Sequence, residues 1–118
     1  MLERLRDLER EFFDVEARLG DPELIADQSR YQDVARRYSE LGPIVEAAQQ
    51  LRQRTDDLET AKEMLTDLDG DDREVMRVEA TEAEADIERL QATLRVLLMP
   101  KDPNEGKNVI VEIRGAEG

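Results

Sequence analysis

Residues 76–100 have the sequence MRVEATEAEADIERLQATLRVLLMP, which contains the most regular pattern in the chain. Apolar side chains recur there in alternating steps of four and three, at Met76, Ala80, Ala83, Ile87, Leu90, Leu94 and Leu97. This spacing places them on one side of an α-helix, and it is typical of helices that pack against another helix. The pattern predicts a long helix that stops at Pro100, because proline cannot continue it.

A second apolar stripe lies upstream, and its steps are again mostly three and four. It comprises Tyr31, Val34, Tyr38, Leu41, Val45, Ala48, Leu51, Thr55, Leu58, Ala61, Leu65 and Leu68. Gly42-Pro43 interrupts it without changing its phase, so we expect either a kink or a stop and restart with both pieces roughly aligned. A continuous helix from Ser29 to Thr66 would be about 55 Å long.

A third apolar stripe lies nearest the N-terminus, at Leu5, Leu8, Phe12, Val15 and Leu19. It predicts an amphipathic helix over residues 2–19. Gly20 ends it. Asp21 then suits an N-cap and Pro22 the first helical position, where a missing N–H is harmless. We therefore expect a short helical turn through residues 24–26.

The segment 67–72 predicts a chain reversal between the two long helices. Gly70 suits a left-handed, helix-terminating conformation, and Asp71 or Asp72 suits the cap of the next helix. The predicted fold is all-α: an antiparallel, coiled-coil-like helical hairpin with the N-terminal helix packed against it, a three-helix arm over residues 1–100. Small residues at Ala80 and Ala83 favour close helix approach near the reversal.

The composition excludes several kinds of chemistry. The chain has no Cys and no His, which removes disulfides, thiol chemistry, imidazole catalysis and the usual zinc ligands. Asp67-x-Asp69-Gly70-Asp71 resembles a calcium loop, but the glycine comes early and position twelve is Val78, which favours a plain capped turn. We expect neither enzyme activity nor a cofactor or metal site, in a soluble cytoplasmic chain without a membrane span.

Negative charge is concentrated in one block. Of a formal net charge of −13, residues 56–88 contribute −11, from 14 acidic and three basic side chains. The fold prediction puts this block at the far tip of the hairpin, where it would repel phosphate rather than bind nucleic acid. A solvated acidic face is the simpler interpretation. The alternative is a surface for a basic protein partner, with these candidate residues: Glu74, Glu79, Glu82, Asp86 and Glu88.

The C-terminal segment has a different pattern. Residues 101–108 resemble a linker, and Val109-Ile110-Val111-Glu112-Ile113 is typical of a strand. A lone strand leaves its backbone groups unpaired. We therefore expect residues 101–118 to be a linker and the first strand of a truncated second domain, either unpaired or disordered in this chain.

Three stretches resemble bacterial class I peptide chain release factors. The first two are Leu19-Gly20-Asp21-Pro22 with Ile25-Ala26-Asp27, and Tyr31 to Tyr38 with Leu41 and Pro43-Ile44-Val45. The third and most specific is the junction Leu97-Leu98-Met99-Pro100-Lys101-Asp102-Pro103, followed by residues 107–114, which is similar to type one of this family. The resemblance covers essentially the whole chain. Glu117 departs from the small residues common at that point of the family.

The resemblance implies an N-terminal, non-catalytic docking arm of a translation termination factor. The parent protein would recognise the stop codons UAA and UAG and promote hydrolysis of peptidyl-tRNA. The motifs for both steps, a Pro-x-Thr type tripeptide and a Gly-Gly-Gln loop, do not occur in these 118 residues. The implied partners are the ribosomal stalk-base protein and the release-factor glutamine methyltransferase.

Two other kinds of function stay open from the residues alone. One is a stand-alone coiled-coil adaptor or chaperone-like hairpin. The other is a coiled-coil homo-oligomer, in which the stripes would pair between chains.

Overall fold

The computed structural model describes residues 1–100. These residues form the helices α1 (Leu2–Arg18), α2 (Pro22–Ala26), α3 (Gln28–Leu65) and α4 (Gly70–Leu97), and no strand occurs among them. The predicted all-α class is confirmed. The predicted linker and the predicted strand at Val109–Ile113 lie outside the described residues.

Helix α3 is continuous through Pro43. Its 38 residues give a length of about 57 Å at about 1.5 Å per residue. Pro43 lies on the exposed side, whereas Leu41 and Val45 beside it are buried. Packing on one side and hydration of the interrupted backbone on the other allow the helix to pass the proline. The alternative of a stop and restart is therefore wrong.

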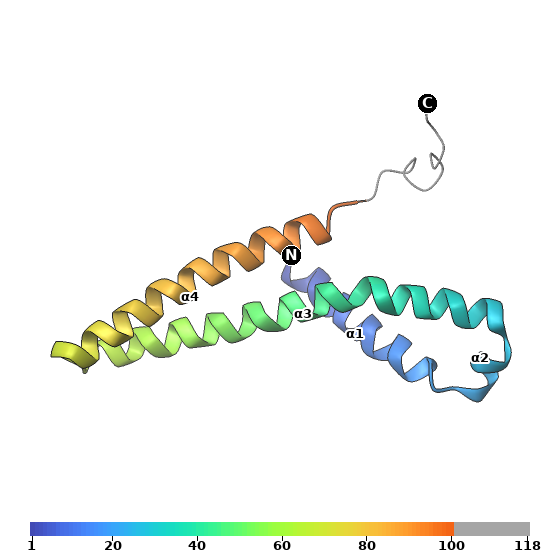
Figure 1. Cartoon of the computed structure of the whole chain (residues 1–118), viewed down its shortest axis with the longest axis horizontal. Coiled ribbons are helices and arrows are strands. Elements are labelled where there is room, and N and C mark those ends of the chain that lie inside the picture. Colours follow the sequence, from blue (N-terminus) through green and yellow to red (C-terminus); the bar gives the residue numbers. More distant parts are fainter. Residues whose placement is uncertain (101–118) are drawn as a thin grey trace, which may run out of the picture.

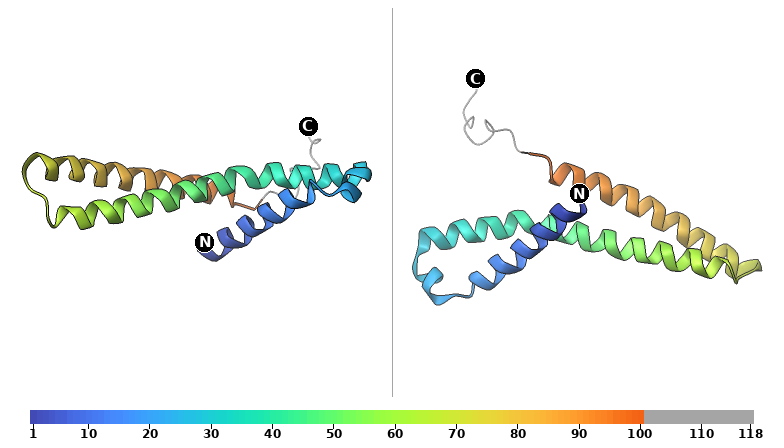
Figure 2. Two further views of the ribbon diagram at one scale, coloured as in Figure 1. Left: turned by 90° about the horizontal axis from the view of Figure 1, so that it is seen from below. Right: turned by 180° about the vertical axis from the view of Figure 1, so that it is seen from behind.

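Two antiparallel helix pairs share α3 (Figure 1). α1 runs beside its first half, and α4 runs beside its second half, as the other views also show (Figure 2). The predicted hairpin of α3 and α4 is confirmed. We call the end of the hairpin where α4 stops its base, and α1 packs there rather than along the paired helices. The reversal at residues 66–69 therefore lies at the free end of the α3–α4 pair.

The main core lies where the two pairs overlap. It is built from Leu5 of α1, Ala47 and Ala48 of α3, and Leu90, Leu94 and Leu98 at the end of α4. The prediction placed Leu97 here, but Leu97 is 37% exposed and Leu98 only 8%. In a straight helix, positions that follow a strict heptad repeat move gradually around the helix axis. A second step of four, from Leu94 to Leu98, therefore reaches the core where a step of three to Leu97 does not.

A second core joins α1, α2 and the first half of α3. Val15, Leu24, Val34 and Leu41 are buried there. The ring of Phe12 stacks on that of Tyr38 with centroids 4.8 Å apart. The predicted cap at Asp21 is confirmed, since its carboxylate accepts a hydrogen bond from the backbone N–H of Glu23 at 3.0 Å.

The reversal differs from its prediction in detail. Gly70 has the predicted positive φ, 60°, but it begins α4 instead of terminating α3. The N-cap residue is Asp69, not Asp71 or Asp72, and its side chain makes no capping hydrogen bond. Asp71 and Asp72 lie in the first turn, where their charge complements the helix dipole. Arg73 donates to the carbonyl of Leu65 at 2.5 Å and so closes the end of α3.

Candidate docking site

All five predicted docking residues lie on α4, but they fall into two groups. Glu74, Glu82 and Glu88 are exposed to solvent. Glu79 and Asp86 are half-buried and turn toward α3. The structure therefore does not bring the five carboxylates together on one free surface.

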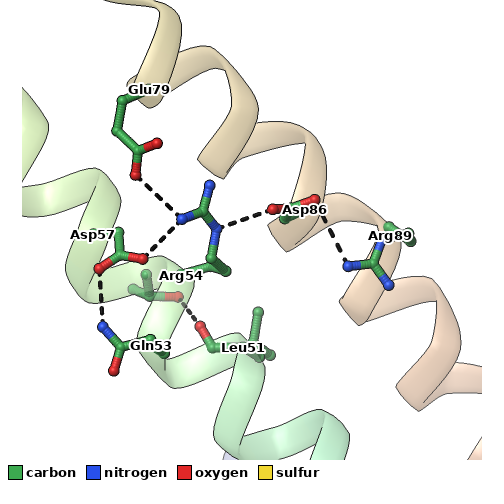
Figure 3. A network of polar contacts seen from close by, with 8 residues as sticks. Leu51, Gln53, Arg54, Asp57, Glu79, Asp86 and Arg89 are labelled. Atoms are coloured by element: carbon green, nitrogen blue, oxygen red, sulfur yellow. Dashed lines mark hydrogen bonds and ion pairs between the residues drawn. The ribbon is translucent and has the colours of Figure 1, made fainter. Parts of the chain in front are cut away.

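Glu79 and Asp86 differ from the other three because both pair with Arg54 of α3 (Figure 3). Its Nη1 donates to Asp57 Oδ2 at 2.8 Å and to Glu79 Oε2 at 3.2 Å, and its Nε lies 3.0 Å from Asp86 Oδ2. Arg89 adds a longer ion pair to Asp86 at 3.7 Å. The cation thus forms ion pairs with two carboxylates of α4 and one of α3, which leaves Glu79 and Asp86 occupied within the hairpin.

The charges around Arg54 shift each other's protonation equilibria. Burial alone lowers the pKa of Arg54, but the hydrogen bond to Asp57 and the nearby charges of Glu79 and Asp86 raise it above its ordinary value. The pKa of Asp57 is lowered, first by the hydrogen bond from Gln53 and then by Arg54, against the opposing effect of burial. Both shifts favour the charged forms of Arg54 and Asp57, as their hydrogen bond requires.

Sequence reasoning missed Arg54. A signal was present, because Leu51, Arg54, Leu58 and Ala61 follow the same three-and-four spacing as the inner stripe of α3. That spacing places the arginine beside the seam, facing the acidic residues of α4.

Arginine–carboxylate pairs also hold α1 against α3. Arg37 binds Glu11 through two parallel hydrogen bonds, at 2.7 Å and 2.5 Å. Arg52 makes a similar pair with Glu9. The Tyr38 hydroxyl donates to Glu16 at 3.1 Å. These contacts fix the base of the arm and leave the acidic tip as the free end.

Acidification should weaken the contact between α1 and α3. The hydrogen bonds from Arg37 lower the pKa of Glu11, although burial acts in the opposite direction. Because the folded-state pKa is depressed, this stabilisation is present above the unfolded-state pKa of about 4.3 and disappears as pH falls through the folded value. The difference in unfolding free energy between wild type and Glu11→Gln should therefore be constant near neutral pH and shrink in acid, as measured by urea titrations. A difference that grows in acid would contradict this assignment.

A hollow of about 580 Å³ lies at the base and is lined by Arg4, Leu8, Arg37, Glu40, Ile44 and residues 97–100. Among residues 1–100 no group of three or more carboxylates could hold a metal ion. Nor does that part of the chain contain a helix long and apolar enough to cross a membrane.

Comparison with known proteins identifies the family of this hairpin. The PCRF domain matches residues 8–118. The chain belongs to the PCRF domain family. Peptide chain release factor 1 of Maridesulfovibrio salexigens is 42% identical over all 118 residues. The chain spans about a third (33%) of the length of this curated relative. No solved structure gave a significant match. The predicted resemblance to class I release factors is thus confirmed for this PCRF domain.

Proposed function

We propose that this PCRF domain is the N-terminal arm of a translation termination factor of type one. In this proposal the parent protein recognises UAA and UAG in the ribosome and promotes hydrolysis of peptidyl-tRNA. The observation that carries it is the family match over residues 8–118, together with a hairpin (Figure 1) whose free end is acidic. Family membership favours this function over a stand-alone adaptor or a homo-oligomer.

The domain itself acts as a docking arm and catalyses neither step. Support comes from the described residues, whose carboxylates lie on exposed helix faces or are paired with arginines. Such positions are open to solvent or occupied by ion pairs, whereas acid–base catalysis needs a group held against a bound substrate. Residues 1–100 form the docking domain, and residues 101–118 lead into the next one. Release of peptide by the 118-residue chain alone would contradict this part of the proposal.

The proposed partners are the ribosomal stalk-base protein and the release-factor glutamine methyltransferase, both met in the cytoplasm. An acidic surface suits a basic protein and repels the phosphates of ribosomal RNA. We assign the docking contact to the exposed residues Glu74, Glu82 and Glu88. Glu79 and Asp86 instead hold the hairpin together through Arg54.

Reversing the three exposed charges of α4 should weaken ribosome binding. The variant carries Glu74→Lys, Glu82→Lys and Glu88→Lys, and we expect its dissociation constant for purified ribosomes with a stop codon in the A site to rise about tenfold or more. The effect should decrease at high salt, since exposed charges are screened. Fluorescence anisotropy of the labelled 118-residue chain measures it.

The matched control carries the same change of charge elsewhere. Glu3, Asp14 and Glu46 are exposed and lie outside the tip, so their replacement by lysine should leave the affinity nearly unchanged. Equal losses in both variants would show that only net charge matters. That result would refute a docking contact at the tip.

A further inference from the structure

Helix α4 has a second apolar seam on its outer side. Its positions alternate in steps of three and four, and all are exposed: Val75, Val78, Glu82, Ala85, Arg89, Ala92 and Val96. Five of the seven are apolar. This is the spacing of a helix that packs against another helix along its length.

The outer seam, as defined by those seven residues, lies mostly away from α3, and only Val75 and Arg89 border hollows that α3 also lines. The side of α4 that faces α3 contains Ala83, Leu90 and Leu94, which are 0–2% exposed. At about 100° per residue the centre of the outer seam lies about 130° around the helix from these buried residues. Within residues 1–100 its side chains stay exposed to solvent.

The side chains of the outer seam suit close helix packing. Val75, Val78 and Val96 are 61%, 49% and 66% exposed. Ala85 and Ala92 lie between these larger residues, so another helix can approach closely at the centre. Near the tip a shallow hollow of about 320 Å³ is lined by Glu74, Arg77, Val78, Thr81 and Glu82. An isolated exposed valine needs no explanation, but a regular seam along a whole helix suggests a binding partner.

Charge along the seam identifies the kind of partner. Residues 70–88 contain eight acidic and two basic side chains, whereas residues 89–100 contain two basic and no acidic ones. The complementary surface is therefore strongly basic beside the tip half and neutral or acidic beside the base half. Nucleic acid fails this criterion, because its phosphates would meet the acidic half. A second copy is disfavoured, because each chain has a net charge of −13.

We propose that the outer seam of α4 binds an amphipathic helix of a partner protein, with the lysine and arginine residues of that helix beside residues 70–88. The inference rests on the docking role proposed above, and it adds the face and the mode of recognition. Apolar contact at the seam supplies affinity, and the polarised charge fixes the direction of the bound helix.

A steric test separates this contact from the charges of the tip. Ala85→Gln with Ala92→Gln fills the centre of the seam without changing charge and with only a small loss of helix propensity. The matched control is Ala17→Gln with Ala26→Gln, which places the same side chains at exposed positions of α1 and α2. The probe is the purified ribosome with a stop codon in the A site, titrated with the labelled 118-residue chain. We expect the seam variant to bind about tenfold more weakly and the control to bind like wild type.

Any other result would contradict either the seam inference or the docking role on which it rests. If the wild type binds and both variants bind equally well, the seam inference fails while the proposed function stands. If the wild type does not bind at all, the docking role fails and the inference fails with it. Sedimentation equilibrium tests the second copy: a wild-type dimer that the seam variant abolishes would make the seam a self-interface and refute a partner helix. Circular dichroism checks that each variant keeps its helical content.

Discussion

Replacing Leu94 with alanine should lower the free energy of unfolding by about 2–5 kcal/mol, the largest single effect that we expect. Leu94 is 0% exposed and lies in the core that joins α1, α3 and α4. The substitution removes apolar burial and leaves a cavity that three helices would have to collapse around. Urea denaturation followed by circular dichroism measures the change.

The control for Leu94 is its neighbour on the predicted stripe. Leu97 is 37% exposed, so Leu97→Ala should cost less than about 1 kcal/mol. The comparison also tests the shift of the inner stripe from Leu97 to Leu98. A larger loss at Leu97 than at Leu94 would show that the strict heptad continues to Pro100.

Enlarging Ala83 should give the second large effect. Ala83 is 0% exposed on the side of α4 that faces α3. A leucine there has no room, so the two helices must move apart, at a cost of about 1–3 kcal/mol. Thermal unfolding of Ala83→Leu should show the loss as a clearly lower melting temperature.

Ala85→Leu is the matched control for Ala83→Leu. It makes the same chemical change two residues away, on the exposed side, and should change stability by no more than about 0.5 kcal/mol. Equal destabilisation by the two substitutions would mean that the assignment of inner and outer faces of α4 is wrong.

The helices and their caps were predictable because their causes are local. The repeats of three and four, the Asp21-Pro22 start and the positive φ of Gly70 each depend on a few adjacent residues. The cap at Asp71 or Asp72 was wrong because several aspartates in succession satisfy the same local rule, and only the path of the loop selects Asp69.

The pairing of charges across the hairpin was not predictable in the same way. Whether Arg54 meets Glu79 and Asp86 depends on how α3 and α4 are aligned, and this alignment is set by the whole interface. For the same reason the sequence did not show that α1 packs beside only the first half of α3. The docking role of Glu74, Glu82 and Glu88 stays a prediction.

The continuity of α3 through Pro43 has a mechanical consequence. A lateral force on the loop at residues 66–69 acts on two paired helices, because α3 has no break near the proline at which it could bend. α4 is about 42 Å long. At the other end of the hairpin, Leu94 and Leu98 hold α4 in the core, directly before Pro100. The arm can therefore transmit displacement from its tip to the point where the chain leaves it.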